Sequence, residues 1–397
     1  MGAVPAPRRK SLAGKRVLVT DAESRLGLYV IRSLGRAGCR ITALSGKTHG
    51  PVLGFGSRFT ARRYRLPAGD YPETLSGVIE ELAPSHDLLM PVTAFSFSVV
   101  ASGAERLAPR IPFFVPPLEA FQIASDKRQT AAVAQRAGVP VPESYSLSEM
   151  DSITDWAAQM AHRLPLVIKF SDEDRSGSWA PADRYRIVRS RSELVEEYTR
   201  MHAIGPYPLV QEYVEGEGYG FFAVFDRCGA PTAVFCHRRL REYPISGGPS
   251  TLCESYYDSA LVDVGTRLLK ALDWRGVAMV ECKRDRRTGE YKVLEINPRF
   301  WGSLPLALRC GVDFPVYQAQ IALGFDPTPP SSYPLGRKVR FFFPDFLAVR
   351  DEWRAGGRWR VGKRYLRELL NPSIRDGFFD PLDPWPTVAY LAEKLRR

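Results

Sequence analysis

The sequence is poor in cysteine and has no long apolar run. Its six cysteines are scattered over 397 residues, and none belongs to a Cys-x-x-Cys pair. A disulfide-stapled fold or a zinc ribbon is therefore not expected, and this cysteine usage suits the reducing cytoplasm. No stretch approaches the ~20 apolar residues of a membrane-spanning helix. We therefore expect a cytoplasmic globular protein.

The body of the chain has no excess charge of either sign. The net charge of +11 comes from 55 Lys and Arg against 44 Asp and Glu. All of the excess lies in residues 1–16, with five basic residues and no acid, and residues 331–397, with fourteen basic and eight acidic residues. An extended nucleic-acid surface is therefore not expected. Two interpretations of the basic ends stay open: solvated tails and helix faces, or contact with an acidic surface, a membrane or a partner.

The first hundred residues have the pattern of an α/β domain. Residues 16–20 and 40–44 read as buried strands, and residues 26–37 have helical spacing. This strand–helix–strand order predicts a parallel sheet, which residues 87–91 and 112–115 would continue. The turn after the first strand carries two carboxylates and a single glycine, so it lacks the phosphate-binding fingerprint of a dinucleotide site.

The middle of the chain is rich in strand patterns. We expect a helix from Lys127 that stops at Gly138, and another helix over residues 259–272. Strands are expected over residues 166–170 and 207–214. Two hairpins are expected, formed by residues 219–225 with 232–238 and by residues 276–283 with 291–296.

Three oxygen-bearing side chains stand out on the second hairpin. Glu295 and Asn297 are two residues apart, so they share one face of their strand, and Glu281 can face them from the partner strand. Mg²⁺ prefers such hard oxygen ligands, particularly when phosphate oxygens complete its shell. Arg299 can project the same way and hold a phosphate as a bidentate donor. The alternative, a polar strand surface, fits poorly because Val293, Leu294 and Ile296 indicate a buried strand.

Two further features suit a nucleotide. Lys169 lies within the apolar run Leu-Val-Ile-Lys-Phe, and an unpaired lysine there is costly unless it meets an anion or reaches solvent. Residues 211–216 form a strand that runs into a loop, where the backbone at Tyr213 and Val214 can bind an adenine edge. Glu215 can accept hydrogen bonds from ribose hydroxyls.

Residues 237–251 are expected to form a substrate loop after the first hairpin. Three arginines and a Ser-Gly-Gly turn suit a carboxylate or another anion, although solvated surface arginines are the alternative. His237, as a lone histidine, is weak evidence for acid–base chemistry. The predicted substrate-binding residues are Arg238, Arg239, Arg241, Ser246, Gly247 and Gly248.

These motifs, taken in order, resemble the ATP-grasp superfamily. The stretches 297–303 and 311–315 look most like its carbamoyl-phosphate-synthase-like and biotin-carboxylase-like branch. The resemblance covers about residues 15–325. It implies a mixture of α/β and α+β architecture, with an N-terminal Rossmann-like pre-ATP-grasp domain, a two-lobed ATP-grasp fold and a basic aromatic C-terminal extension. The implied boundaries are a disordered arm over 1–13, the first domain over 14–116, the ATP-grasp domain over 117–326 with lobes 117–210 and 211–326, and the extension over 327–397.

The resemblance also implies roles for individual residues. Lys127 and Lys169 would bind ATP phosphates, and Lys169 would also lie near the adenine. Arg299 would steady the transferred phosphate or an acyl-phosphate. The adenine and ribose would be held by Gln211, Glu212, Tyr213, Val214 and Glu215, and Mg²⁺, or Mn²⁺ in its place, by Glu281, Glu295 and Asn297.

One segment departs from the family pattern. Residues 171–179, where a glycine-rich lid is usual, contain one glycine and three acids. The function implied is nevertheless an ATP-dependent ligase that joins a small-molecule or peptide-like carboxylate to an amine through an acyl-phosphate. Two alternatives stay open: an ATP-binding module without turnover, which the acidic lid favours, and an enzyme that forms an acyl-phosphate without an amide, or a carboxylase.

Overall fold

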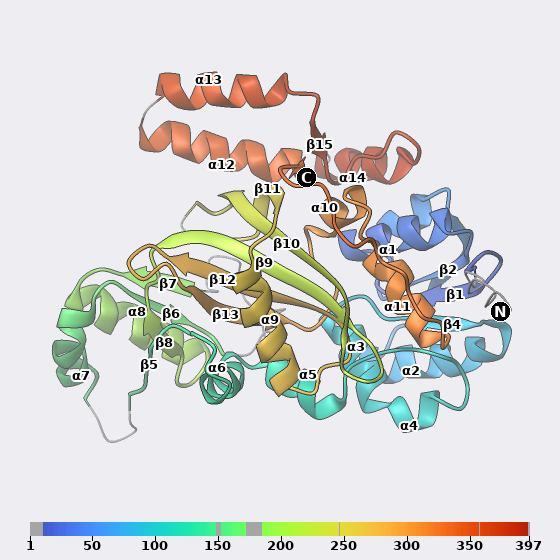
Figure 1. Cartoon of the computed structure of the whole chain (residues 1–397), viewed down its shortest axis with the longest axis horizontal. Coiled ribbons are helices and arrows are strands. Elements are labelled where there is room, and N and C mark those ends of the chain that lie inside the picture. Colours follow the sequence, from blue (N-terminus) through green and yellow to red (C-terminus); the bar gives the residue numbers. More distant parts are fainter. Residues whose placement is uncertain (1–10, 148–151, 172–184, 246, 357, 396–397) are drawn as a thin grey trace, which may run out of the picture.

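The computed structural model describes residues 11–147, 152–171, 185–245, 247–356 and 358–395 (Figure 1). The expected acidic lid, all but its first residue, and Ser246 lie outside these ranges, as does most of the expected N-terminal arm. Leu12, at the end of that arm, is buried in the protein core. None of the helices within the described ranges is long and apolar enough to cross a membrane.

The N-terminal part is built on a four-stranded parallel sheet in the order β3-β2-β1-β4. Helix α1 begins after Ser24, whose side chain accepts a hydrogen bond from the amide of Gly27, and its apolar side is buried in the core. The elements are β1 (Arg16–Val19), α1 (Arg25–Arg36), β2 (Arg40–Ser45), η1 (Leu53–Gly56), β3 (Thr60–Arg65), α2 (Tyr71–Leu82), η2 (Ala83–Ser85), β4 (Leu88–Met90), α3 (Ala94–Ser102), α4 (Ala104–Leu107) and α5 (Leu118–Ser125).

The parallel sheet differs from the expectation in two strands. Residues 112–115 form no strand, because this proline-flanked segment offers the sheet only one ladder bond, from the amide of Leu89 to the carbonyl of Pro112. The fourth strand of the sheet is instead β3, which pairs with β2 at the edge opposite β4. Its sequence, Thr-Ala-Arg-Arg-Tyr-Arg, is mostly exposed and so lacks the apolar signal of a buried strand.

A seven-stranded sheet forms the centre of the molecule, in the order β13-β12-β9-β10-β11-β14-β15. Helices α5, α6 and α9 share one buried core with one face of its strands, and both expected hairpins are present in it. Its elements and the helices around it are α6 (Lys127–Arg136), β9 (Gly216–Phe225), β10 (Pro231–Glu242), β11 (Ser250–Tyr256), α9 (Ser259–Ala271), β12 (Gly276–Asp285), β13 (Tyr291–Asn297), α10 (Leu304–Arg309), α11 (Phe314–Ala322), β14 (Lys338–Arg340) and β15 (Ile374–Asp376).

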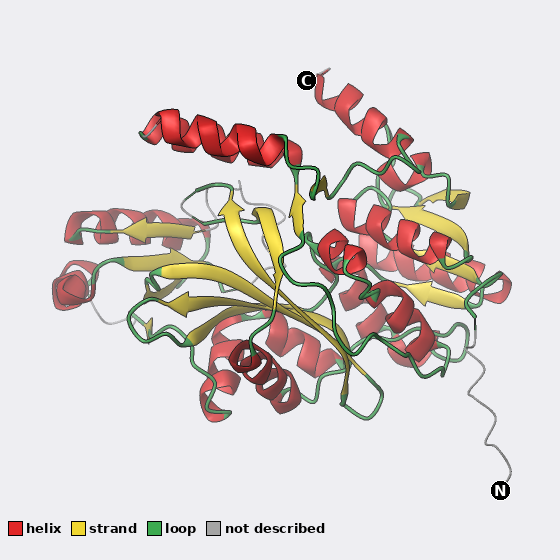
Figure 2. Ribbon diagram, turned by 45° about the horizontal axis from the view of Figure 1, so that its top comes forward, coloured by secondary structure: helices red, strands yellow, loops and turns green. Residues whose placement is uncertain are grey.

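A smaller antiparallel sheet, in the order β5-β8-β6-β7, lies beside the end of the large sheet that carries β13 (Figure 2). Leu166, Ile168 and Val210 pack on its helices, so the alternate residues, Lys169 among them, face the other way. The elements are β5 (Ser144–Tyr145), α7 (Ile153–Gln159), η3 (Met160–Arg163), β6 (Leu166–Lys169), β7 (Tyr185–Val188), α8 (Arg191–Ile204) and β8 (Leu209–Glu212).

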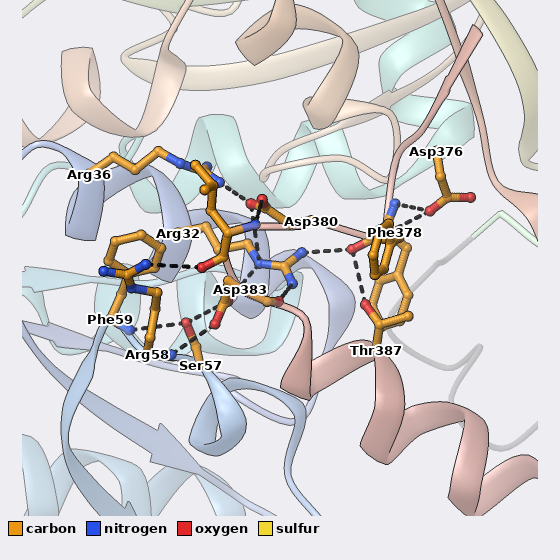
Figure 3. A network of polar contacts seen from close by, with 12 residues as sticks. Arg32, Arg36, Ser57, Arg58, Phe59, Asp376, Phe378, Asp380, Asp383 and Thr387 are labelled. Atoms are coloured by element: carbon orange, nitrogen blue, oxygen red, sulfur yellow. Dashed lines mark hydrogen bonds and ion pairs between the residues drawn. The ribbon is translucent and has the colours of Figure 1, made fainter. Parts of the chain in front are cut away.

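The C-terminal segment adds β14 and β15 to the large sheet and then returns to the N-terminal part. Its helices are α12 (Phe342–Ala355), α13 (Arg358–Leu369) and α14 (Trp385–Leu395). Arg32 of α1 is almost fully buried and donates to the Asp383 carboxylate, the Asp383 carbonyl and the Phe378 carbonyl at 2.7–2.9 Å (Figure 3). Asp383 also accepts from Ser57 and from the amide of Arg58. The segment is therefore an integral part of the fold.

Candidate active site

The second hairpin brings the three predicted oxygen ligands together. Glu281 of β12 lies opposite Glu295 of β13, and Asn297 lies one pair further along the same face. The side-chain Nδ2 of Asn297 donates a hydrogen bond to Glu281 Oε1 at 3.1 Å. Two carboxylates and an amide oxygen therefore share a small patch of one sheet face.

Cationic side chains surround these two carboxylates. Lys127 Nζ lies 3.3 Å from Glu295 Oε2, and Arg239 forms an ion pair with Glu281. Although burial acts against it, the charges of Lys127 and Lys169 lower the pKa of Glu295 to about 2. Burial, with the neighbouring Glu295 charge, raises the pKa of Glu281 despite its contact with Arg239. The pair therefore combines one firmly ionised carboxylate with one whose charge depends on nearby cations.

Both predicted phosphate lysines reach this patch from other elements. Lys127 is the first residue of α6. The preceding residue, Asp126, caps the helix, because its carboxylate accepts hydrogen bonds from the backbone amides of Arg128 and Gln129. Lys169 lies at the end of β6, and its Nζ lies 3.4 Å from the carbonyl oxygen of Leu294 on β13. Lys169 therefore spans the junction between the small and the large sheet.

The predicted nucleotide segment lies at the same junction. Glu212, at the end of β8, contacts Lys292 of β13 with both carboxylate oxygens, at 2.7 and 2.8 Å. The carbonyl of Val214 accepts from Lys283 Nζ at 3.2 Å, and that ammonium lies 5.1 Å from the centre of the Tyr213 ring. The segment therefore connects the two sheets through lysines of β12 and β13.

Two other residues of the nucleotide segment have different surroundings. Gln211 is buried, and its amide donates to Ser144 Oγ at 2.9 Å. Glu215 is exposed and forms an ion pair with Arg286 at 2.5 Å. Glu215 is thus accessible to a ligand, whereas Gln211 helps to hold β8 against β5.

The prediction of a long substrate loop over residues 237–251 is wrong. Strand β10 continues to Glu242 and β11 begins at Ser250, so only residues 243–249 connect them. The sequence suggested a loop because this stretch has many arginines and glycines. The two strands nevertheless pair up to Glu242 and Ser250, with register shifts on either side of Arg241.

The three arginines of β10 do not converge. Arg238 turns to the opposite sheet face and pairs with Glu254. Arg241 is buried and contacts both oxygens of Asp345, at 2.7 and 2.8 Å, and Glu368 at 2.7 Å. Of the three, Arg239 lies with the hairpin carboxylates.

The Gly247–Gly248 turn lies against Arg239. Arg239 Nη1 donates to the carbonyl of Gly248 at 3.2 Å, and the hydroxyl of Tyr185 on β7 donates to the carbonyl of Gly247. Gly247 has a φ of +136°, which favours glycine. The turn therefore connects the small sheet with the arginine that contacts Glu281.

Arg299 lies two residues beyond the end of β13. Its Nη1 donates to the carbonyl of Phe300 at 2.9 Å, and its backbone amide donates to the carbonyl of Asn297 at 2.8 Å. The strand alternation that would place it with Glu295 and Asn297 has ended at that point. Its predicted role at a phosphate stays a prediction.

Two glycines of β9 make room for the side chains of β10. Gly220 lies between Glu281 on one neighbouring strand and His237 on the other. A Cβ at Gly220 would lie 2.8 Å from His237 Nε2, and a Cβ at Gly218 would lie 2.8 Å from Arg239 Cδ. Without side chains at these positions, Arg239 can cross β9 and reach Glu281 on β12.

His237 is a residue whose place beside the site was not predicted from the sequence. It is buried, and within the described part of the chain neither ring nitrogen has a hydrogen-bond partner. Burial, reinforced by the charge of Arg239, lowers its pKa well below the usual value, so the imidazole is neutral. The sequence offered one clue: its alternation places His237 and Arg239 on the same face of a strand.

Lys283 and Lys292 were not predicted as site residues. Both lie on buried strands that carry the predicted carboxylates, which is the same signal that singled out Lys169. Lys292 contacts Asp285 at 3.1 Å in addition to Glu212. These lysines link the two sheets next to the nucleotide segment.

The donor set fits a hard divalent cation. The described residues contain no cluster of three or more His, Cys, Asp or Glu side chains suited to a metal. A cation at Glu281, Glu295 and Asn297 would therefore need further oxygen ligands, such as those of a triphosphate. Mg²⁺ commonly combines one or two carboxylates with substrate phosphates in this way.

The architecture is that of a mixed α/β ATP-grasp fold. A biotin carboxylase from Campylobacter jejuni, solved as a β,γ-ATP complex, has a TM-score of 0.65 at 17% identity, covering 82% of this chain and 75% of that one. An L-amino acid ligase from Bacillus licheniformis has a TM-score of 0.57 at 16% identity, covering 78% and 74%. At these identities the likeness concerns the fold alone.

Sequence comparisons point the same way. Residues 207–340 match the family described as ATP-grasp in the biosynthetic pathway with Ter operon. The carbamoyl phosphate synthase large chain of Pyrococcus furiosus is 26% identical over 271 residues, which cover 65% of this chain and 24% of that protein. The predicted resemblance to the ATP-grasp superfamily and its carbamoyl-phosphate-synthase-like branch is therefore confirmed. The chain spans only about a quarter of that relative.

Proposed function

We propose that the protein is an ATP-dependent ligase that joins a carboxylate to an amine through an acyl-phosphate. The proposal rests on one observation: Lys127 and Arg239 contact the cluster of oxygen ligands formed by Glu281, Glu295 and Asn297. A carboxylate and a triphosphate repel each other, so a site that joins them needs both metal ligands and cations. This patch offers both within one sheet face.

The reaction needs two displacements. A carboxylate oxygen attacks the γ-phosphorus of ATP, and the bond to the β–γ bridging oxygen breaks to release ADP. The amine then attacks the acyl carbon, the carbon–oxygen bond to phosphate breaks, and the nitrogen loses a proton. Because this chemistry depends on alignment and charge neutralisation, the protein needs no covalent nucleophile.

Different residues of the site would bind the metal, the phosphates and the nucleoside. Glu281, Glu295 and Asn297 would hold Mg²⁺, or Mn²⁺, which when bound neutralises phosphate charge. Lys127 and Lys169 would bind phosphate oxygens, and Arg299 the transferred group. The adenine and ribose would be held by Gln211, Glu212, Tyr213, Val214 and Glu215.

Among the predicted substrate residues, Arg239 has the strongest support. It crosses the glycine pair of β9, and it touches both Glu281 and the Gly247–Gly248 turn. A substrate carboxylate beside Arg239 would lie next to the metal ligands and the phosphate. Arg238 and Arg241, with acidic partners elsewhere, are better explained as structural residues.

The proposed domain boundaries follow the sheets except at β8 (Leu209–Glu212), a strand of the small sheet that the boundary between the two lobes crosses. We propose a pre-ATP-grasp domain over residues 14–116, with Rossmann-like topology, and ATP-grasp lobes over residues 117–210 and 211–326. The nucleotide would lie between the lobes, at the junction that Glu212 and Lys169 span. The extension over 327–397 would brace the second lobe.

The test is release of ADP and phosphate by the purified protein with ATP, Mg²⁺ and pooled carboxylates, with and without pooled amines. We expect release that needs both pools and that is lost in Glu295→Gln, while Glu290→Gln, in the turn of the same hairpin, stays active. Release with carboxylates alone would favour an enzyme that forms an acyl-phosphate without an amide. Tight ATP binding without release under any pair would favour a module without turnover.

A further inference from the structure

Exposed apolar side chains are concentrated in the C-terminal segment. In the described part of the chain, fourteen of the nineteen exposed large apolar side chains lie between Leu335 and Leu391. The surfaces of soluble proteins seldom carry such a group of exposed apolar side chains unless it binds another molecule. The nucleotide site uses none of them.

Helix α13 shows the densest part of this surface. Trp359, Leu366 and Leu370 are 83%, 57% and 74% exposed, and they recur at the spacing of one helical stripe that continues one residue beyond the helix. Lys363 and Arg367 lie on the same stripe by their spacing. We name these five residues the outer stripe: Trp359, Lys363, Leu366, Arg367 and Leu370.

The opposite side of α13 faces the protein. Tyr365 packs its ring over the Arg340 guanidinium at 5.3 Å, and Glu368 accepts from Arg241 at 2.7 Å. Figure 1 shows α13 at the edge of the molecule, with α12 between it and the large sheet. The outer stripe is therefore held on a well-anchored helix and points away from the core.

The acidic and basic side chains of this helix pair differ in how they are paired. All four acids of residues 342–370 pair with arginines, and three of them, Asp345, Glu352 and Glu368, form ion pairs with buried Arg241. Five exposed basic side chains, in contrast, have no acidic partner within the described residues. They are Arg354, Arg358, Arg360, Lys363 and Arg367.

We propose that the outer stripe binds the surface of an anionic lipid bilayer. A helix with an indole and leucines beside lysine and arginine has the chemistry of an interfacial helix: the apolar side chains enter the acyl boundary and the cations contact the headgroups. A second copy of this chain fits poorly, because it would bring the same unpaired cations together. This inference goes beyond the proposed ligase and does not depend on it.

The test is cosedimentation of the full chain with vesicles. We expect binding to phosphatidylcholine vesicles that contain phosphatidylglycerol, weak binding to phosphatidylcholine alone, and loss of binding at high salt. Since each basic side chain near such a surface contributes about fivefold in affinity, Lys363→Glu with Arg367→Glu is expected to weaken binding at least ~25-fold. Trp359→Ala is expected to weaken it independently of salt.

A matched control is available at the other end of the molecule. Arg62 and Arg63 lie on exposed edge strand β3, so Arg62→Glu with Arg63→Glu makes the same change in net charge away from the stripe. We expect this control to bind nearly as well as the original chain. Equal weakening by both double variants, equal binding to neutral vesicles, or no vesicle binding would overturn the proposal. So would a dimer in solution that only the stripe variants dissociate.

Discussion

Replacing Arg239 with Met tests the geometry of the site most sharply. The Arg239 side chain is 11% exposed, contacts Glu281 and Glu242, and crosses β9 where two glycines make room. Removing one preorganised donor from a charge-stabilising site typically costs about 10²–10³ in kcat, or roughly 2.7–4 kcal/mol. We expect a loss of kcat of that size, because Arg239→Met removes the guanidinium donor and leaves Glu281 without its cationic partner.

The neighbouring arginine provides the control. Arg238 lies on the same strand but on the opposite face, where its partly exposed side chain pairs with Glu254. Since such pairs contribute about 0–1 kcal/mol, Arg238→Met is expected to change turnover less than about threefold. The assay is ADP release at saturating ATP, with thermal unfolding of both variants in parallel. Turnover of Arg239→Met within threefold of the original chain, or an equal loss in Arg238→Met, would refute the reasoning.

Three further outcomes follow from the same contacts. The pKa of Glu295 is lowered to about 2, so its carboxylate stabilises the fold at pH values above the ordinary glutamate pKa of about 4.3, and this stabilisation is lost as the pH falls through 2. Lys127→Met is expected to move this loss to higher pH in acid-unfolding curves. Arg241→Met leaves the fully buried Asp345 short of its main cation, and chemical denaturation is expected to show a loss of about 3–5 kcal/mol. Gly220→Ala places a Cβ 2.8 Å from His237 Nε2, so we expect about 1–3 kcal/mol of destabilisation and a lower kcat.

The sequence was sufficient where a local pattern decides the structure. The hairpin of β12 and β13 follows from two apolar strand segments on either side of a Thr-Gly turn, and its register places Glu281 opposite Glu295. Helix α6 begins at Lys127, directly after its cap Asp126, and ends before Gly138, as capping predicts. These elements carry the proposed metal ligands and Lys127.

Long-range contacts explain what the sequence could not show. Arg241 resembled a substrate ligand, but its partner Asp345 lies 104 residues further along the chain. Neither the bulge near Arg241 nor the exposed edge strand β3 produces a pattern of apolar residues in the sequence from which it could be predicted. The importance of His237 depends on Gly220, which is adjacent only in the folded sheet.

The central claim is that an acyl-phosphate forms, and oxygen transfer tests it most directly. A carboxylate substrate from the pooled assay is labelled with heavy oxygen in its carboxyl group, and the released phosphate is analysed by mass spectrometry. The account predicts one labelled oxygen in each phosphate formed with the amide, and no labelled phosphate from Glu295→Gln. Amide formation with wholly unlabelled phosphate would contradict it.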